Sequence, residues 1–226
     1  MDGEVIGDVL ADVIERARRA VATPEALAAY ERTLAEAKRL EQSEARGRRK
    51  RALVEAGVPL TDAMLRAVLD GELLSTRALR TTTAWLEGPR PVLVLVGPRG
   101  VGKTVAAAHV AMTRLSRGSL VYVREPTLAR WGMFARYDRE WAAAVACATL
   151  IVDEIGTATA RDLEAARGAL LRVVDDRLGR GRRTVLVGNL SEGDIGRRFD
   201  GRLVDRLHEI GHVAELDGES MRSGGR

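Results

Sequence analysis

The spacing of hydrophobic residues changes near residue 91, and this change divides the sequence into two parts. In the first part, apolar residues at helical spacing predict one face of a helix: Val5, Ile6, Val9, Leu10, Val13 and Ile14. Thr23-Pro24-Glu25 has the residue types of a helix start, and a long charged helix is predicted from there to about residue 56, before Gly57-Val58-Pro59. Two shorter helices are predicted over residues 61–70 and 76–87.

Continuous apolar runs replace the helical spacing after Pro91. They cover residues 92–96, 120–123, 150–152, 184–187 and, less regularly, 212–216. Such runs are typical of strands that are buried on both faces. Strands that alternate with helical patterns predict a parallel sheet between two layers of helices. We therefore expect an α/β domain with a five-stranded parallel sheet over residues 76–226, preceded by a helical N-terminal region over residues 1–75.

Composition and charge narrow the class of protein. Hydrophobic residues make up 46% of the 226 residues, which is enough to bury a core, but aromatic residues make up only 4%, so Leu, Val and Ala must build it. The net charge of +4 permits nucleic-acid binding without requiring it. The single cysteine, Cys147, excludes an internal disulfide and a cysteine-based zinc cluster, and we expect it to be a buried structural thiol.

The N-terminus does not have the features of a secretory signal. Met1-Asp2-Gly3-Glu4 is acidic and lacks a basic segment. No uninterrupted apolar run approaches the roughly 18 residues that a membrane span requires. We expect a cytoplasmic protein that does not contact a membrane.

A phosphate-binding motif follows the first predicted strand. The residues Gly97-Pro98-Arg99-Gly100-Val101-Gly102-Lys103-Thr104 fit G-x-x-x-x-G-K-[ST] and stand between a strand and an Ala- and Val-rich helix, which is the context that the motif requires. Glycines let backbone N–H groups converge on phosphate oxygens, and the helix N-terminus adds its dipole. Lys103 is expected to reach the β- and γ-phosphates of ATP and Thr104 to ligate Mg²⁺. The alternative is a chance glycine-rich turn.

Two later strands end in polar residues. A carboxylate at the end of a strand beside the phosphate loop can hold Mg²⁺ directly or through water, and Asp153 has this place. Glu154 is then a candidate for orienting and deprotonating the attacking water. Asn189 follows the strand at 184–187 and is a candidate for contacting the γ-phosphate or the water. The alternative for each is an ordinary polar turn after a strand.

Arg202 and Arg206 are four residues apart, which places them on one helix face. An arginine from a neighbouring subunit can stabilise the charge on a transferred phosphate, and such a residue accelerates hydrolysis by roughly 10³–10⁵. The alternative is a solvated basic face next to Asp205.

The order of these motifs resembles the AAA+ ATPases, specifically the DnaC-type helicase loaders and the related IstB transposition helpers. The resemblance extends from about residue 46 to the end. It also rests on a lead-in helix ending in Ala-Gly-Val-Pro (49–59), a strand similar to sensor 1 (184–191, TVLVGNLS), a helix similar to the arginine-finger helix (202–207, RLVDRL), and the closing segment Gly218-Glu219-Ser220-Met221-Arg222.

The resemblance implies roles for individual residues. Asn189 would be sensor 1, Arg206 the arginine finger with Arg202 beside it, and Arg222 a residue that approaches the nucleotide like a sensor 2. It also implies ATP hydrolysis and a homo-oligomer that shares its ATP sites. Typical AAA+ proteins continue into a helical lid. The sequence ends about ten residues after its last predicted strand, so we expect no C-terminal lid, as in this branch of the family.

The resemblance also implies partners. In this family the N-terminal region chooses the partner protein, so residues 1–75 would bind a replicative helicase, or a transposase in the IstB case. The first 45 residues match no known pattern. The segment Arg130–Trp141 interleaves arginines with aromatic residues that can stack on the bases of single-stranded DNA, although Trp131, Phe134 and Trp141 can equally well be core residues.

Three functions are therefore open. The first is a helicase loader on single-stranded DNA, and the second is an ATP-dependent transposition helper on duplex DNA. The third is a nucleotide-gated adaptor with negligible catalysis. The presence of Lys103, Thr104, Asp153 and Glu154 argues against the adaptor, because no residue needed for hydrolysis is missing.

Overall fold

A computed structural model describes residues 23–71, 75–199 and 201–218. The chain divides into two compact units, residues 1–48 and 49–226. The predicted helix over residues 5–14 and the closing segment with Arg222 lie outside the described residues. The functional boundary that we expect near residue 75 stays a prediction.

Helix α2 (Pro24–Glu55) begins and ends where the sequence predicts. Pro24 occupies the first helical position, and Glu25 lies in the first turn, where a negative charge is favourable. Gly57 follows the helix with a φ of 88°, the left-handed conformation that commonly ends a helix. Within the described ranges, no helix combines the length and the apolar character needed to cross a bilayer.

Two short helices, α3 (Asp62–Leu69) and α4 (Arg77–Glu87), precede the sheet in the second unit. Their first turns are capped by Thr61 and Thr76, whose hydroxyls accept hydrogen bonds from the N–H groups of Met64 and Leu79. The remaining elements are β1 (Val92–Val96), α5 (Lys103–Leu115), β2 (Leu120–Arg124), α6 (Glu125–Met133), η1 (Ala135–Tyr137), α7 (Asp138–Ala146), β3 (Thr149–Ile155), α8 (Leu163–Leu178), β4 (Arg183–Gly188), α9 (Glu192–Arg198), α10 (Gly201–Ile210) and β5 (Gly211–Glu215).

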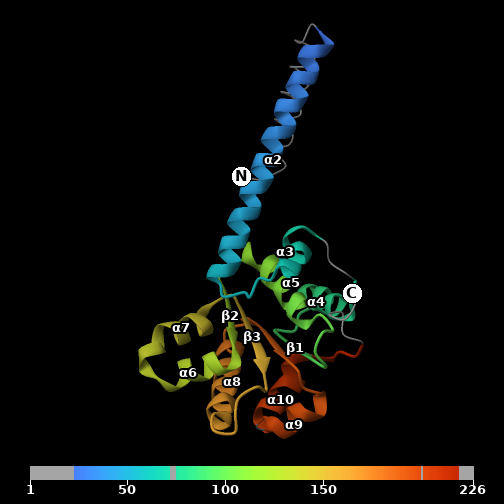
Figure 1. Cartoon of the computed structure of the whole chain (residues 1–226). Helices are drawn as coiled ribbons and strands as arrows, with labels where there is room; N and C mark the ends of the chain where they lie inside the picture. The colour runs from blue at the N-terminus through green and yellow to red at the C-terminus, as the bar shows by residue number, and fades with distance from the viewer. Residues whose placement is uncertain (1–22, 72–74, 200, 219–226) are drawn as a thin grey trace. The chain divides into compact units, whose positions relative to one another are not determined.

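The five strands form one parallel sheet in the order β2-β3-β4-β1-β5, as predicted in type and number. Alternate residues of β1 belong to two cores: Leu93 and Leu95 pack with α3, α4 and α5, whereas Val94 and Val96 pack with α6, α8 and α10. The helices thus cover both faces of the sheet (Figure 1). Burial on both faces explains why β1 is a continuous apolar run and why β3 and β4 are largely apolar, whereas the edge strand β5 is more exposed and less regular.

Strand β3 contains a β-bulge that the sequence pattern does not reveal. Val152 is paired with Leu186 and Ile155 with Gly188, so β3 has one residue more than β4 between these pairs. Glu154 lies in the bulge with a φ of 58°, and no other non-glycine residue in the described ranges has a positive φ. Gly188 accommodates the bulge, because a Cβ atom there would lie 2.8 Å from the carbonyl oxygen of Ile155.

The buried guanidinium of Arg177 joins the end of α7 to the start of β4. Its Nη1 donates to the carbonyl oxygens of Ala144 (2.6 Å) and Cys147 (2.9 Å), and its Nη2 donates to that of Arg183 (2.6 Å). The carbonyl groups of Ala144 and Cys147 lie at the C-terminal end of α7, where no further helical turn can bond to them, so Arg177 satisfies them. Cys147 is buried, as expected, and burial raises the pKa of its thiol.

Tyr122 connects three segments of the second unit. Its backbone N–H donates to the carbonyl oxygen of Ala56 just after α2 (2.7 Å), and its hydroxyl donates to Asp153 Oδ2 on β3 (2.5 Å). The side chain is buried. Burial and the negative charge of Asp153 raise the pKa of Tyr122 far above its ordinary value, so the hydroxyl remains a donor.

Replacing Tyr122 by Phe should remove this hydrogen bond and keep the ring. We expect the variant to be less stable by about 1–3 kcal/mol near neutral pH, because one oxygen of the buried Asp153 loses its donor. The pKa of Tyr122 is higher in the folded than in the unfolded state, where it is about 10. Its contribution to stability is therefore complete below that pH and is lost as the pH rises further.

Urea denaturation of both proteins over about pH 7–11 measures this contribution. The difference in the free energy of unfolding should be constant up to about pH 9.5 and should shrink above it. A difference that grows with pH would contradict this account of Tyr122.

Candidate functional site

The segment Gly97–Thr104 forms a tight loop between β1 and α5. Gly97, Gly100 and Gly102 have φ values of 130°, 90° and 90°, which favour glycine. Gly97 also lies against the end of β5, since a Cβ atom there would be 2.0 Å from the carbonyl oxygen of Leu216. Gly102 caps α5 without a side chain, so the loop leads the first N–H groups of the helix toward a potential anion.

The ammonium group of Lys103 is held within this loop. Its Nζ donates to the carbonyl oxygens of Gly97 (2.8 Å) and Pro98 (2.5 Å), and the residue is only 5% exposed. A buried cation needs such partners. The positive charge is therefore fixed beside the glycine loop, as phosphate binding requires.

The loop opens into a cavity of about 870 Å³. Asp153 and Glu154 of β3 and Asn189 after β4 line this cavity. Five of the eight phosphate-loop residues line it as well: Arg99, Gly100, Gly102, Lys103 and Thr104. Of the other three, Gly97 and Pro98 bond to Lys103 through their carbonyls, and Val101 packs in the core. The size is that of a small-molecule site. The structure thus brings the predicted phosphate and acidic residues together.

The two acidic residues of the bulge differ in exposure. Asp153 is 7% exposed, and its Oδ1 accepts a hydrogen bond from the N–H of Glu154 (2.7 Å). The Glu154 side chain is 46% exposed, and its Oε2 lies 3.8 Å from Nη1 of Arg124. A held carboxylate beside a more accessible one suits two roles, metal binding by Asp153 and proton transfer by Glu154.

Thr104 and Asp153 supply the oxygen atoms that Mg²⁺ prefers. Among the described residues no group of three or more His, Cys, Asp and Glu could hold a metal by itself. In a nucleotide site, Mg²⁺ takes one or two protein oxygens and completes its shell with phosphates and water.

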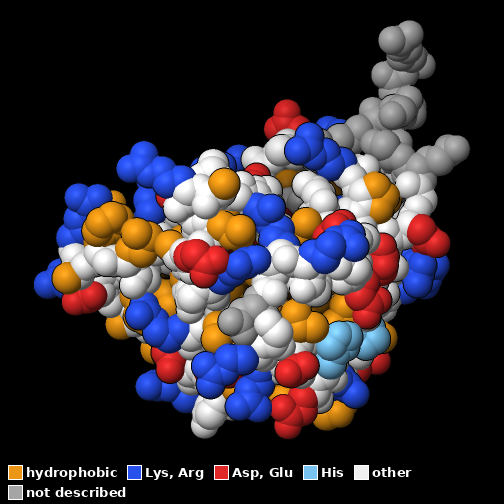
Figure 2. Space-filling view, turned by 90° about the horizontal axis from the view of Figure 1, so that it is seen from below, with side chains coloured by type: hydrophobic (Ala, Val, Ile, Leu, Met, Phe, Trp, Pro, Cys, Tyr) orange, Lys and Arg blue, Asp and Glu red, His pale blue; other side chains and the backbone are white. Residues whose placement is uncertain are grey.

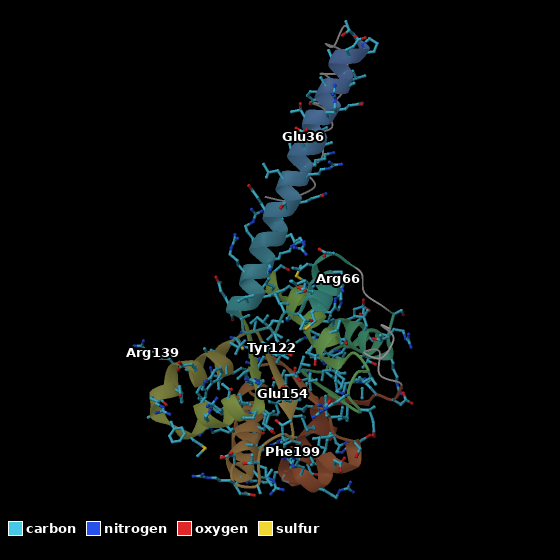
Figure 3. All side chains as sticks on the ribbon, viewed as in Figure 1. Glu36, Arg66, Tyr122, Arg139, Glu154 and Phe199 are labelled. Carbon is cyan, nitrogen blue, oxygen red and sulfur yellow. The ribbon has the colours of Figure 1, made fainter. Side chains whose placement is uncertain are left out.

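The far side of the cavity comes from residues that the sequence analysis did not single out. They precede or belong to α3 and α4: Pro59, Thr61, Met64, Arg66, Ala67, Thr76 and Leu79. Figure 3 labels Arg66 on α3, above the sheet that carries Tyr122 and Glu154. Apolar walls with a few hydroxyl groups are suited to a planar base. In the sequence, Thr61 and Thr76 are recognisable only as residues that cap the starts of helices, and a helix cap alone does not indicate a ligand-binding residue.

The predicted arginines on α10 do not line this cavity. Leu203 and Leu207 anchor the helix in the core. Arg206 Nε lies 3.3 Å from Asp175 Oδ1, and Arg206 Nη1 lies 3.0 Å from Glu209 Oε2. Arg202 is exposed on the same helix. The position of Arg222 lies outside the described residues, so its role stays a prediction.

The segment Arg130–Trp141 divides between core and surface. Trp131 and Trp141 pack partly buried against the core, and the guanidinium of Arg172 lies 4.0 Å from the centre of the Trp141 ring. Met133 and Phe134 are exposed by 55% and 44%. Basic side chains surround hydrophobic ones at the left of Figure 2, the side on which α6 and α7 lie in Figure 1. The core interpretation is therefore confirmed for Trp131 and Trp141, whereas base stacking by the exposed Phe134 stays a prediction.

Solved structures with the same fold include replication proteins. The DnaC helicase loader matches with a TM-score of 0.57 and 18% identity, over 70% of this chain and 100% of that one. DnaI matches with a TM-score of 0.55 and 17% identity, over 71% of this chain and 96% of that one. The replication initiator DnaA, bound to AMPPCP and single-stranded DNA, matches with a TM-score of 0.54 and 14% identity, over 62% of this chain. The match spans 45% of that initiator's length.

The sequence itself matches a family of nucleotide-binding proteins. No curated protein matches it at a significant level. The family model described as IstB-like ATP binding protein matches residues 60–226, more than half of the chain and all of the described cavity except Pro59. With the AAA+ fold and the phosphate loop in place, the chain belongs to the family of IstB-like ATP-binding proteins.

Proposed function

We propose that the chain is an ATPase that uses ATP binding and hydrolysis to time an assembly on DNA. The observation that supports hydrolysis is the convergence of Lys103, Thr104, Asp153, Glu154 and Asn189 in one cavity. A binding module without catalysis needs the phosphate loop alone. Retention of both acids beside the loop favours an enzyme over a nucleotide-gated adaptor.

Each residue would then have one role in the transfer of the γ-phosphate to water. Lys103 would exchange its bonds to two loop carbonyls for bonds to phosphate oxygens. Mg²⁺ held by Thr104 and Asp153 would neutralise phosphate charge. Glu154 would accept a proton from the attacking water as ADP leaves, and Asn189 would orient the water or the γ-phosphate.

The base of the nucleotide would lie on the far side of the cavity. Met64 and Leu79 supply apolar surface for a planar ring, and Thr61 and Thr76 stand at the helix starts beside them. Arg66, which also lines the cavity, places a cation on this side. The nucleotide would thereby hold α3 and α4 against the phosphate loop.

Replacing Lys103 by Ala should mainly weaken ATP binding, whereas replacing Glu154 by Gln should mainly slow turnover. We expect the first change to lower ATP affinity by at least about tenfold, because the cation nearest the phosphates is lost. The second should leave affinity nearly unchanged and slow hydrolysis by about 10²–10⁴, because a proton acceptor is lost. Binding of a fluorescent ATP analogue and release of phosphate, each with and without DNA, measure the two effects.

The matched control is Glu164→Gln, which neutralises an exposed acid on α8. It should change neither quantity. Equal turnover for the native protein and Glu154→Gln would remove Glu154 from its proposed role.

The ATP site would be completed by a second copy of the chain. Arg206 does not line the cavity of its own chain, and its partners are the exposed acids Asp175 and Glu209. Ion pairs between side chains this exposed are weak. The Arg206 guanidinium could therefore leave these carboxylates and pair with a phosphate of ATP bound to the neighbouring subunit at little cost in free energy. Arg202, on the same face of α10, would lie beside it.

Replacing Arg206 by Ala should therefore slow ATP hydrolysis at the site of the neighbouring subunit without weakening ATP binding. We expect near-normal ATP affinity with hydrolysis lowered by at least about 10²-fold, since an arginine finger contributes 10³–10⁵. A mixture of Arg206→Ala with Lys103→Ala should recover activity, because one interface in the mixture holds an intact Lys103 and an intact Arg206. Titration of one variant into the other with a phosphate-release assay measures the recovery, and a flat titration would argue against a shared site.

A helicase loader on single-stranded DNA is the first candidate for the assembly. The DnaC loader shares the fold, and the matched DnaA structure holds single-stranded DNA. In this chain, Phe134 is exposed, and the guanidinium of Arg136 lies 5.1 Å from the centre of its ring and 4.9 Å from the centre of the Tyr137 ring. A base could therefore stack on Phe134 while Arg136 contacts the neighbouring phosphate. Residues 1–75 would bind the replicative helicase.

A transposition helper on duplex DNA is the second candidate. The family description, IstB-like ATP binding protein, favours it. In this case residues 1–75 would bind a transposase, and the subunits would form ATP-dependent filaments along duplex DNA. The ATP site is the same in both candidates, so only the DNA form and the partner distinguish them.

Binding to single-stranded and duplex oligonucleotides of equal length distinguishes the two assemblies. For a loader, Phe134→Ala should weaken single-stranded binding about fivefold or more, because a stacking surface is lost. Arg136→Ala should lower the salt dependence by about one phosphate contact. Arg180→Ala, an exposed arginine beyond α8, is the matched control. Filaments that form on duplex DNA alone, seen by electron microscopy, would favour the helper, and co-purification of a replicative helicase would favour the loader.

A further inference from the structure

Glu125 is a buried carboxylate at the start of the helix that follows β2. It is the first residue of α6 and is 1% exposed. Its Oε2 accepts hydrogen bonds from three successive backbone N–H groups, those of Gly156 (2.9 Å), Thr157 (3.0 Å) and Ala158 (3.1 Å). Successive N–H groups that converge in this way form an anion-binding nest. The anion here belongs to the chain itself.

These three bonds account for the presence of a charge in the core. A buried carboxylate is unfavourable unless hydrogen bonds replace its water. Bonds from N–H groups to an ionised oxygen are roughly twice as strong as neutral ones. The nest therefore stabilises Glu125, and Glu125 in turn fixes the backbone of residues 156–158.

The fixed loop is bonded directly to Glu154. The backbone N–H of Thr157 donates to Glu125 Oε2 and also to the carbonyl oxygen of Glu154, with an N···O distance of 3.2 Å for the second bond. The Thr157 hydroxyl donates to the same carbonyl oxygen at 2.8 Å. Glu154 has a left-handed φ of 58°, which is unfavourable for a residue with a Cβ atom. Such a conformation persists only where the surroundings impose it.

Other contacts close the loop from the opposite side. The guanidinium of Arg198 donates to the carbonyl oxygen of Ala158, and Ala158 itself is buried. Gly156, with a φ of 82°, packs so closely on Leu190 that a Cβ atom would lie 2.5 Å from its Cδ1. The loop therefore has little freedom, and the carboxylate of Glu125 is the group that holds its N–H face.

We propose that Glu125 is a positioning residue for Glu154. Its carboxylate sets the loop 156–158, the loop sets the bulge, and the bulge directs the Glu154 side chain into the nucleotide cavity. The catalytic part of this inference rests on the proposed ATPase function. The alternative is that Glu125 serves the stability of the fold alone.

The test uses the full chain with Glu125→Gln, which keeps the shape and removes the charge. Hydrogen exchange followed by mass spectrometry should show faster exchange in peptides covering residues 154–160, by about tenfold, with little change in β1 or α5. ATP affinity should stay within about twofold, whereas turnover should fall by at least about tenfold, because displacement of a catalytic group by about 1 Å can cost 10²-fold. Glu87→Gln, an exposed acid at the end of α4, is the matched control and should change none of these quantities.

A second variant distinguishes positioning from a general loss of stability. If Glu125 acts through Glu154, adding Glu125→Gln to Glu154→Gln should slow turnover by no more than about twofold further, because the group being positioned is already gone. A purely structural role would instead make the two losses multiply.

The results that would overturn the positioning role of Glu125 differ from the result that would overturn the proposed ATPase function. Unchanged exchange at residues 154–160 overturns the proposal, as does unchanged turnover in Glu125→Gln or a multiplicative double variant. If the native protein binds ATP and does not hydrolyse it, the proposed ATPase function fails, while the exchange measurement still decides whether Glu125 holds the loop.

Discussion

The whole site depends on the parallel alignment of the five strands. In a parallel sheet all carboxyl ends lie at one edge, so segments that are distant in the sequence meet there. The loop at Gly97–Thr104 leaves β1, the acids 153–154 end β3, and Asn189 follows β4. The order β2-β3-β4-β1-β5 places β4 between the loop strand and the acid strand. An interstrand spacing of about 4.8 Å then sets the distance between these three segments.

Local patterns were sufficient to predict the sheet and the phosphate loop. A strand buried on both faces is apolar along its length, and the run 92–96 is short and rich in valine, which favours a strand over a helix. The loop requires glycine where φ is positive, and Gly97, Gly100 and Gly102 meet this requirement in the structure. These elements follow from the residues they contain, and they needed no knowledge of the rest of the chain.

The parts of the site that were missed depend on contacts between distant segments. The bulge at Glu154 is set by a mismatch between β3 and β4, which no periodicity within β3 reveals. Glu125 precedes a proline at a helix start, a place where an acid is usually exposed, and its burial follows from the loop that folds over it. The walls made by α3 and α4 are ordinary helix residues until the phosphate loop is placed next to them. The aromatic segment was ambiguous because the same residue types build a core and stack on bases, and the structure assigns Trp141 to the former and exposes Phe134.

The hydrogen bond between the Tyr122 N–H and the Ala56 carbonyl has a consequence for the solubility of the chain. Strand β2 is at the edge of the sheet, and an edge strand with unpaired N–H groups can template the addition of a strand from another molecule. Tyr122 is the middle residue of this five-residue strand, and its outward N–H group is occupied. Gly57 presses on the same residue, with a virtual Cβ atom 2.4 Å from the Tyr122 carbonyl oxygen. The Ala56 carbonyl group therefore blocks the position at which a strand of another molecule would add to this edge of the sheet.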